Sequence, residues 1–425
     1  MEFRSTRGGG DEVGLEVALG SGTAPDGGLY MPTVLPELSV DAFHGAETWV
    51  EIAEELLKPF FVGSNLASQL SDICRDAFDF PLKVTGSSPH VLELFHGPTS
   101  AFKDVGARFL AACLSRIPEA QGKTILVATS GDTGGAVAAA FFRRSGFRVV
   151  ILFPEGRVSL RQQHQLTCWG ENILSLAVQG AFDDCQRMVK QAFANPQWVE
   201  SYSLASANSI NIGRLMPQMT YYAAASLWHY RAYGEKPNFL IPTGNLGNAF
   251  SCVLARAIGL PIGEIVLVTN ANKPIPDFLK TGMWEPRATI ETLASAMDVG
   301  NPSNMERLRD LYPDHPVLSQ MVSAYSVDDE SIKSRIQQEF GETAEVHCPH
   351  TATALDVYRR EYPDQSNTIV VATAHAAKFD DIIEPLTGPV AVPDNLAMLL
   401  ERPANFDTIE GDVEVMINRL ANWEG

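Results

Sequence analysis

One local pattern occurs twice in this chain and constrains its fold: an apolar run, a glycine-containing turn and a small-residue helical stretch. The first copy predicts a strand at 124–129, a turn SGDTGG at 130–135 and a helix at 136–144. The second predicts a strand at 239–242, a turn TGNLGN at 243–248 and a helix at 249–256. Such a turn points backbone N–H groups and the positive end of a helix dipole at one spot, which suits an anion. Two copies indicate a ligand with two anionic ends, or a ligand beside a cofactor.

Neither turn matches a nucleotide-binding fingerprint. The chain has no G-x-x-x-x-G-K-[ST] loop and neither turn reads G-x-G-x-x-G, so Walker-type and dinucleotide sites lack support. Either turn alone is equally explained as a tight connection, because glycine relieves backbone crowding and helix starts need capping. The presence of both turns is what favours a ligand site.

Length and charge set the outer limits of the interpretation. A chain of 425 residues exceeds one ordinary hydrophobic core and predicts two or more lobes. The formal net charge of −19 disfavours nucleic acid and anionic membrane surfaces as partners. An anionic small-molecule substrate must therefore be attracted by local groups.

Strand and helix patterns alternate along most of the chain. Further buried strands are expected at 147–153, 173–178, 264–269 and 368–373, and helices at 160–169, 181–194 and 213–233. This alternation predicts an α/β fold of two lobes, with parallel-rich sheets covered by helices. Residues 1–90 have scattered glycines and prolines with only two short helical patterns, which predicts an N-terminal lobe. The expected domains are 1–90, a small α/β domain at 119–233, and a large domain formed by 91–118 and 234–425.

The six cysteines predict free thiols, because they include no C-x-x-C pair and no tight Cys/His cluster. His164 and Cys168 are spaced for one helix face, but two groups make a poor metal site, so no metal is expected. The N-terminus lacks an apolar leader pattern, and no stretch approaches about 18 consecutive apolar residues. We therefore expect a cytoplasmic protein, either monomer or homodimer.

Lys103 lies in an unusual sequence neighbourhood, FHGPTSAFKD at residues 95–104, before an expected helix at 105–115. Small and apolar neighbours favour burial, which disfavours the ammonium form and leaves an amine able to attack a carbonyl. The alternative is a surface lysine paired with Asp104 or Glu93. A reactive lysine and an anion-binding turn are what pyridoxal phosphate requires, since the turn holds the 5′-phosphate and the lysine holds the aldehyde. The second turn is then available for a substrate carboxylate.

Five motifs, in this order, resemble the threonine synthase family: FHGPTSAFKD (95–104), TSGDTG (129–134), SANSIN (206–211), PTGNLGN (242–248) and AMDVGNPSN (296–304). The segments RSTRG (4–8) and APDGGLY (24–30) are similar to the N-terminal lobe of that family. The lysine and turn motifs alone indicate only the wider tryptophan-synthase-β-like group, fold-type II of the pyridoxal-phosphate enzymes. The N-terminal segments and 296–304 narrow the resemblance to threonine synthases and their close relatives.

The resemblance implies a role for each matching residue. Lys103 would form the Schiff base with pyridoxal phosphate and act as general base, Thr373 would bond the pyridine nitrogen, and Phe102 would pack beside the ring. The cofactor phosphate would be held by Gly244, Asn245, Leu246, Gly247 and Asn248. The substrate carboxylate and the ring hydroxyl would be met by Ser130, Gly131, Asp132 and Thr133. The substrate phosphate would be held by Asn208, Ser209 and Arg214, for which the alternative is a solvated helix residue.

The reaction implied by the resemblance converts O-phospho-L-homoserine and water to L-threonine and phosphate, as a carbon–oxygen lyase. The substrate amine would displace Lys103 from the cofactor, and the freed lysine would remove the Cα proton. A Cβ proton would leave next, phosphate would be expelled from Cγ, and water would add at Cβ. One lysine can move several of these protons when its pKa lies near neutrality.

Three positions depart from the expected family pattern: Ser100 replaces a common leucine, Lys273 an acidic residue and Ala376 a proline. None removes a catalytic group, but Ser100 is close enough to Lys103 to alter the pocket. Two alternatives stay open. One is a related phospho-lyase that releases a 2-oxo acid and phosphate. The other is a non-catalytic cofactor-binding homologue, although such a protein is expected to have lost at least one of the groups named above.

Overall fold

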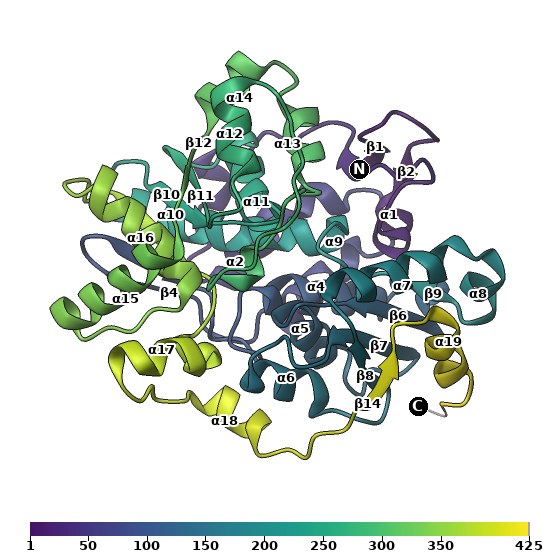
Figure 1. Ribbon diagram of the computed structural model, residues 1–425. Coiled ribbons are helices and arrows are strands. Elements are labelled where there is room, and N and C mark those ends of the chain that lie inside the picture. The colour runs from purple at the N-terminus through teal and green to yellow at the C-terminus, as the bar shows by residue number, and fades with distance from the viewer. Residues whose placement is uncertain (424–425) are drawn as a thin grey trace.

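The computed structural model of this chain describes residues 1–423, which form three sheets surrounded by helices (Figure 1). The largest sheet has the order β12-β11-β10-β13-β5-β4 and is parallel except where β4 pairs with β5. Its strands are β4 Lys83–Gly86, β5 His90–Glu93, β10 Asn238–Pro242, β11 Ile265–Thr269, β12 Ser323–Ser326 and β13 Thr368–Ala372.

The second sheet is parallel throughout, with the order β14-β8-β7-β6-β9. Its strands are β6 Lys123–Ala128, β7 Phe147–Pro154, β8 Ile173–Gln179, β9 Leu204–Ala205 and β14 Asp407–Glu410. A small antiparallel sheet lies near the N-terminus and comprises β1 Glu2–Ser5, β2 Val13–Gly14 and β3 Tyr30–Pro32. These sheets confirm the predicted α/β fold with an additional N-terminal unit.

Helices connect the strands and fill the space between the sheets. The N-terminal segment carries α1 Leu15–Ser21, α2 Trp49–Leu57 and α3 Leu70–Ala77. The middle of the chain carries α4 Lys103–Leu114, α5 Asp132–Phe141, α6 Leu160–Thr167, α7 Phe182–Ala194, α8 Pro196–Ser201, α9 Ile212–Leu215, α10 Met219–Tyr233 and α11 Gly247–Ala257. The remainder carries α12 Pro274–Thr281, α13 Met305–Leu311, α14 His315–Met321, α15 Asp329–Thr343, α16 Pro349–Glu361, α17 Asp380–Thr387, α18 Asp394–Leu400 and α19 Val413–Ala421.

Local chemistry accounts for several of these elements. Every residue of β11 and β13 is buried, because parallel strands are covered on both faces and read as continuous apolar runs. A capping box starts α2: Thr48 accepts a bond from the Glu51 N–H while the Glu51 carboxylate accepts one from Thr48. By contrast, α10 has no amphipathic stripe, because most of its sides are covered by other elements.

Two expectations need correction. The helix expected at 213–233 is interrupted: α9 ends at Leu215, a 3₁₀ turn spans Met216–Gln218, and α10 begins at Met219. Pro217 lies in that turn and has no N–H to donate to a continuous helix. The second correction concerns the C-terminal segment, expected in the large domain at 234–425. Its strand β14 instead pairs with β8, within the sheet of 119–233.

The topology gathers four loops at one edge of the sheets. β5 and β13 are parallel neighbours, so the segments that follow them meet: Ala101 and Ala374 form a bridge, and Phe102 N–H donates to Thr373 O (2.9 Å). The 243–248 turn follows β10, the neighbour of β13 on its other side. The 130–135 turn follows β6 of the second sheet. Ligands of parallel sheets bind at the carboxyl ends of strands, and this is such an edge.

Candidate active site

Lys103 is the first residue of α4, and 15% of its side chain is exposed. The loop before it is fixed by the buried carboxylate of Asp104, which accepts bonds from the Thr99 N–H (2.9 Å) and hydroxyl (2.6 Å). Lys103 Nζ forms an ion pair with Asp132 Oδ2 at 3.8 Å. The alternative expectation, a surface lysine paired with Asp104 or Glu93, is therefore not what the structure shows. The lysine therefore faces an internal carboxylate while remaining open to a small ligand.

The electrostatic surroundings favour the neutral amine of Lys103. Burial lowers its pKa below the ordinary lysine value, Asp132 opposes that change, and the charges on Lys378 and Arg214 add to it. A lysine whose pKa is lowered in this way is a better nucleophile and proton acceptor near neutral pH. The structure therefore supports the sequence-based expectation of a reactive amine.

The turn after β6 begins at Ser130 and brings Asp132 to the start of α5. Thr129 Oγ1 accepts bonds from the N–H groups of Gly131 (3.0 Å) and Gly134 (2.9 Å), which fixes the shape of the turn. Within residues 1–423, the backbone N–H groups of Ser130, Asp132 and Thr133 have no acceptor. Three free donors at a helix start suit a carboxylate, whereas the N–H of Gly131, which was also expected to take part, is occupied by Thr129.

The turn after β10 is shaped for an anion. Leu246 adopts φ 64°, a left-handed conformation uncommon for a branched residue, and α11 starts at the next residue. At Gly244, a Cβ atom would lie 2.7 Å from the Met297 Cα, so this turn has no room for a side chain there. In the part of the chain that the structure describes, no group accepts from the backbone N–H groups of residues 244–248.

Asn248 is the last residue of this turn, and its side chain is buried. Its Oδ1 accepts hydrogen bonds from the hydroxyls of Tyr221 and Tyr222, the latter at 2.8 Å. Its buried Nδ2 has no partner among the described residues. A buried amide donor left without an acceptor is costly unless a ligand accepts from it.

Arg214 lies on α9 with its side chain almost completely buried. Its Nη1 donates to Ala207 O (2.8 Å), while its Nε has no partner within the described chain. Burial disfavours the charged form and lowers its pKa to about 10, and Asp104 opposes this change. A buried guanidinium with a free donor is suited to an anionic ligand, and the alternative of a solvated helix residue is wrong.

Further bonds connect the segment 208–214, which is expected to hold the substrate phosphate, with the 244–248 turn. Asn245 Nδ2 donates to Ser209 Oγ (2.9 Å), and Asn208 lies next to that serine in a turn closed by the bond from Asn211 N–H to Asn208 O (3.0 Å). The structure thus brings these residues of the two motifs together, although 36 positions separate Ser209 from Asn245.

Arg307 was not singled out by the sequence patterns, yet its hydrogen bonds hold the segments around the 244–248 turn together. It is fully buried and donates to Asn304 Oδ1 (2.6 Å), Ile210 O (2.7 Å) and Tyr30 O (3.1 Å). Asn304 in turn donates to Asn245 O (2.9 Å). One guanidinium therefore connects the N-terminal lobe, the 208–214 segment and the 244–248 turn.

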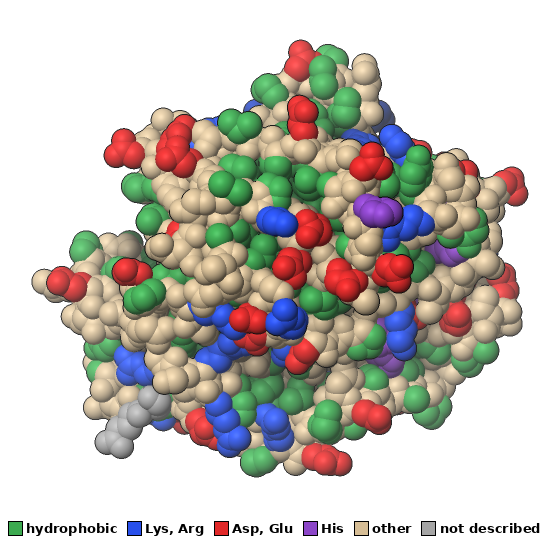
Figure 2. Space-filling model, turned by 180° about the vertical axis from the view of Figure 1, so that it is seen from behind, with side chains coloured by type: hydrophobic (Ala, Val, Ile, Leu, Met, Phe, Trp, Pro, Cys, Tyr) green, Lys and Arg blue, Asp and Glu red, His purple; other side chains and the backbone are tan. Residues whose placement is uncertain are grey.

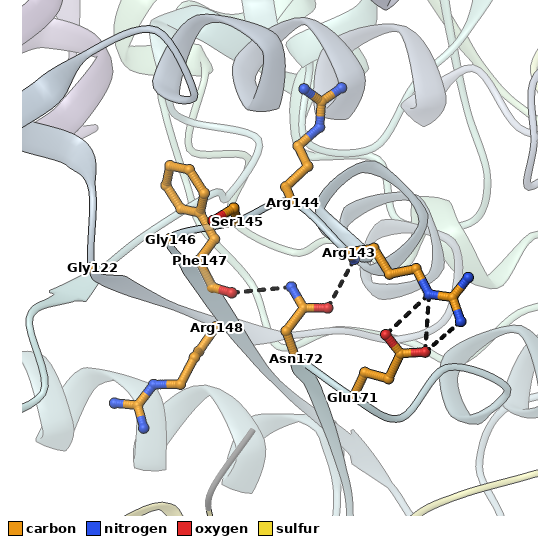
Figure 3. A pocket seen from close by; sticks show the side chains of 9 residues that line it. All are labelled: Gly122, Arg143, Arg144, Ser145, Gly146, Phe147, Arg148, Glu171 and Asn172. Carbon is orange, nitrogen blue, oxygen red and sulfur yellow. Dashed lines mark hydrogen bonds and ion pairs between the residues drawn. The ribbon is translucent and has the colours of Figure 1, made fainter.

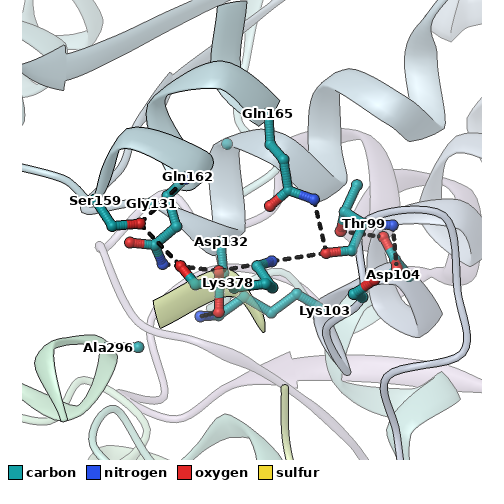
Figure 4. Close-up of polar contacts among 12 residues, drawn as sticks. Thr99, Lys103, Asp104, Gly131, Asp132, Ser159, Gln162, Gln165, Ala296 and Lys378 are labelled. Carbon is teal, nitrogen blue, oxygen red and sulfur yellow. Dashed lines mark hydrogen bonds and ion pairs between the residues drawn. The ribbon is translucent and has the colours of Figure 1, made fainter. Parts of the chain in front are cut away.

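Lys378 is a second residue that the patterns did not identify, and it reaches the centre of the site (Figure 4). Its ammonium is completely buried and lies 2.8 Å from Asp132 Oδ1, with a further bond to Thr99 O (2.7 Å). Gln162 Nε2 also donates to Asp132 Oδ1 (3.0 Å). Although burial raises the pKa of Asp132, the charges of Lys378 and Lys103 hold it well below the usual range. The carboxylate is therefore ionised, with its second oxygen facing Lys103.

The residues present fit pyridoxal phosphate on the observations above. The 244–248 turn offers free backbone donors and a buried orphan amide to a phosphate, and Lys103 offers an amine. The centroid of the Phe102 ring lies 5.4 Å from Lys103 Nζ, and Thr373, the residue directly after β13, accepts the Phe102 N–H through its carbonyl (2.9 Å). The donor set matches the two reactive ends of that cofactor, its phosphate and its aldehyde.

The three departures from the family pattern have different surroundings. Ser100 is buried with φ 55°, and its Oγ accepts a bond from Asn395 Nδ2 (3.0 Å), which connects α18 to the lysine loop. Ala376 is buried in the 3₁₀ turn Ala376–Phe379 that carries Lys378. Lys273 is exposed at the start of α12. Of these, Ser100 and Ala376 border the site.

Other surface features lie apart from this edge. A depression lined by Gly122, Arg143, Arg144, Ser145, Gly146, Phe147, Arg148, Glu171 and Asn172 opens at the amino ends of β6, β7 and β8, opposite to the 130–133 turn (Figure 3). Two of its arginines already pair with carboxylates, Arg143 with Glu171 and Arg144 with Asp76. Seen from behind, the molecule shows acidic and basic side chains interspersed (Figure 2). No described helix has the length and apolar character needed to cross a bilayer.

Three family models match the chain. One is described as pyridoxal-phosphate dependent enzyme and matches residues 91–374, one as threonine synthase N terminus (2–78), and one as threonine synthase, C-terminal (351–418). The threonine synthase of Serratia marcescens is 36% identical over 404 residues, which cover 94% of each chain. The threonine synthase of Escherichia coli is 35% identical over 430 residues, covering 97% of this chain and 98% of that protein.

Solved structures agree with these matches. A threonine synthase from Brucella melitensis with bound pyridoxal phosphate has a TM-score of 0.91 and 33% identity, covering 99% of this chain and 98% of that chain. The Escherichia coli threonine synthase structure has a TM-score of 0.90 and 34% identity, covering 99% and 100%. The similarity therefore extends over the N-terminal unit as well as both large sheets.

Proposed function

This chain belongs to the threonine synthase family of pyridoxal-phosphate-dependent enzymes, and we propose that it converts O-phospho-L-homoserine and water into L-threonine and phosphate at the site around Lys103. One observation carries the assignment of the site: an amine with a lowered pKa lies at the same sheet edge as two separate anion-binding places. These are the 244–248 turn and the buried Arg214. A phosphorylated amino acid and a phosphorylated cofactor together require that arrangement.

The cofactor would be held by groups from three loops, those that follow β5, β10 and β13. The backbone N–H groups of residues 244–248 and the Asn248 amide would hold its phosphate, and the Thr373 hydroxyl its ring nitrogen. Phe102 would pack against the ring. When bound, pyridoxal phosphate supplies an electron sink that stabilises negative charge on the substrate carbons next to the amine.

The protons of the reaction are moved by Lys103. Its neutral Nζ would accept the proton from substrate Cα and release it, so that the amine is free to accept a second proton from Cβ before phosphate departs from Cγ. The proton that water loses when it adds at Cβ would be taken up by the departed phosphate. Lys103 returns protons to Cγ and Cα later, so one group acts alternately as base and acid. A lowered pKa suits both tasks, because it favours the neutral amine that accepts a proton while the ammonium can still form and return it.

The substrate is positioned from both of its anionic ends. The free N–H groups of Ser130, Asp132 and Thr133 bind its carboxylate, while Arg214, with Asn208 and Ser209, binds its phosphate. Arg214 also stabilises the negative charge that develops on the oxygen leaving Cγ. Because this guanidinium is already desolvated, it needs little reorganisation during the reaction.

The test of this assignment compares Lys103→Ala with Lys333→Ala. Lys333 lies on α15 with 42% of its side chain exposed, and among the described residues its ion pair is with Glu330, so its replacement is a matched control for loss of a lysine. We expect Lys103→Ala to lose threonine formation and the visible absorbance of the cofactor-loaded enzyme, and Lys333→Ala to keep both. Threonine formation at the wild-type rate by Lys103→Ala would overturn the role of this amine.

A cytoplasmic location is part of the same proposal, and so is a monomeric or homodimeric state. The location is supported by the six cysteines, which are all buried as free thiols. Gel filtration with light scattering tests the oligomeric state, and a tetramer or larger assembly would contradict it.

A further inference from the structure

We propose that Lys378 is a positioning residue of this reaction: its buried ammonium fixes the Asp132 carboxylate against Lys103 and opposes the pull of that carboxylate on a proton at Lys103. The inference rests on the proposed function of Lys103 as the amine that moves protons. It concerns a group that belongs neither to the predicted cofactor cradle nor to the predicted substrate contacts.

The geometry of three side chains carries the proposal (Figure 4). Asp132 lies between two amines, with Oδ1 at 2.8 Å from Lys378 Nζ and Oδ2 at 3.8 Å from Lys103 Nζ. Lys378 has no exposed surface, whereas Lys103 is partly open to a ligand. The two lysines therefore have unequal roles: one amine is committed to the carboxylate and the other remains available.

Lys378 is held in place from several sides. Its Nζ also donates to Thr99 O (2.7 Å), and that oxygen accepts a second bond from Gln165 Nε2 (3.0 Å). Its own carbonyl accepts from Ser159 Oγ (3.0 Å). A lysine ammonium without these fixed acceptors would lose much of its stabilisation in such a buried place. The bonds therefore explain why a charged group is retained inside the molecule.

The charge balance explains what this lysine does for the reaction. Asp132 alone would attract a proton to Lys103 and favour its ammonium form, and Lys378 counteracts that attraction. Besides Asp132 and Lys378, the charged or titratable groups that act on Lys103 are Arg214 and His350, whereas Asp104 acts on Lys378. Burial lowers the pKa of His350 to about 4, so this imidazole is neutral at physiological pH and does not replace Lys378 as the second cation.

The test uses cofactor-loaded enzyme and follows the proton on the Lys103 nitrogen by pH titration of the visible absorbance, together with the pH profile of kcat/KM. Lys378→Met removes the charge at similar length, and Lys378→Arg retains it. We expect the titration midpoint of Lys378→Met to move about one pH unit upward, with an about tenfold loss of kcat/KM at pH 7. Lys378→Arg should keep the midpoint closer to that of the wild type.

A second comparison covers the case in which Lys378→Met leaves Asp132 unpaired and fails to fold. Asp132→Asn is compared with Asp132→Asn/Lys378→Met, in which no buried carboxylate is left uncompensated. Removal of the lysine should again raise the midpoint by about one pH unit. A purely structural role for Lys378 would lower thermal stability without moving the midpoint. Equal midpoints in either pair would overturn the proposal. If the wild-type enzyme forms no threonine, the proposed function is refuted. The absorbance titration needs no turnover, so it tests the role of Lys378 separately.

Discussion

A Cβ atom added at Gly106 would lie 2.7 Å from the carbonyl oxygen of Arg214, so α4 and α9 are in direct backbone contact. Gly106 is one turn beyond Lys103 in α4, and Arg214 carries the guanidinium assigned to the substrate phosphate. Lys103 and Arg214 are therefore held at a fixed separation by a contact that allows no side chain.

The first prediction concerns this contact. Gly106→Ala should push α9 away from α4, destabilise the fold by about 1–3 kcal/mol and lower kcat/KM about ten- to hundredfold. Gly20→Ala is the control, because Gly20 lies in α1 and a Cβ there meets no atom within 4 Å. Thermal unfolding and steady-state kinetics provide the two readouts. A Gly106→Ala enzyme with wild-type kinetics would show that the close contact is not required.

The second prediction concerns Arg214 itself. Arg214→Lys keeps a positive charge but loses the forked donor geometry and the Nε donor, so KM for O-phospho-L-homoserine should rise about 30- to 100-fold. Inhibition by inorganic phosphate should weaken in parallel, because product and substrate share this contact. Arg187→Lys is the matched control, since Arg187 is exposed on α7 and pairs with Asp184. Unchanged phosphate inhibition in Arg214→Lys would contradict the assignment.

The third prediction concerns the 244–248 turn. Gly244→Ala places a methyl group 2.7 Å from the Met297 Cα, so the turn must shift. Its backbone N–H groups then no longer point toward the same position. We expect cofactor affinity to fall about tenfold or more, measured by absorbance titration of apoenzyme with pyridoxal phosphate. Gly341→Ala on α15 meets no atom within 4 Å and should bind the cofactor normally. Normal affinity in Gly244→Ala would place the cofactor phosphate elsewhere.

The fourth prediction concerns acid stability. Burial raises the pKa of Asp76, but hydrogen bonds and charges from Arg144 and Arg116 outweigh it and hold the value below the usual range. The unfolded chain therefore binds a proton there at higher pH than the folded chain does. The stabilisation is complete above the unfolded pKa of about 3.9 and is lost as pH falls through the folded value.

Asp76→Asn should accordingly lower the unfolding temperature by about 2–4 °C at pH 7, and this difference should close below about pH 4. Asp72→Asn is the control, because Asp72 is exposed and its ion pair within residues 1–423 is with Arg75 of the same helix. Scanning calorimetry across this pH range measures the unfolding temperatures of both variants. A difference for Asp76→Asn that persists unchanged at pH 3 would contradict the linkage.

Periodicity and turn chemistry predicted the elements that position the site. Both glycine-containing turns, at 130–135 and 243–248, follow buried strands and precede helices, because glycine and small residues at those points leave few other conformations. The lowered pKa of Lys103 was also foreseeable, since its small and apolar neighbours indicate burial. These features depend on residues that are close together in the sequence, so a local sequence pattern is sufficient to predict them.

Features that depend on distant contacts were not predictable in the same way. Lys378 is one lysine in a short 3₁₀ turn, and only the folded chain brings it to Asp132, 246 positions earlier in the sequence. In the sequence, Arg307 is an ordinary helix residue, and only the folded chain brings the carbonyls of Tyr30 and Ile210 to its guanidinium. The pairing of β14 with β8 is similarly non-local. A sequence pattern identifies what a segment forms, but not which remote segment covers it.

The most direct test of the central claim is the reaction of cofactor-loaded enzyme with O-phospho-L-homoserine in ¹⁸O-labelled water, followed by mass spectrometry of all products. We predict equal amounts of threonine and phosphate, with one ¹⁸O atom in the threonine hydroxyl and none in the phosphate. That result requires cleavage of the bond between Cγ and oxygen and addition of water at Cβ. Phosphate with 2-oxobutyrate in place of threonine would establish a phospho-lyase, and ¹⁸O in the phosphate with homoserine as co-product would indicate simple phosphate-ester hydrolysis. Either outcome would contradict the account.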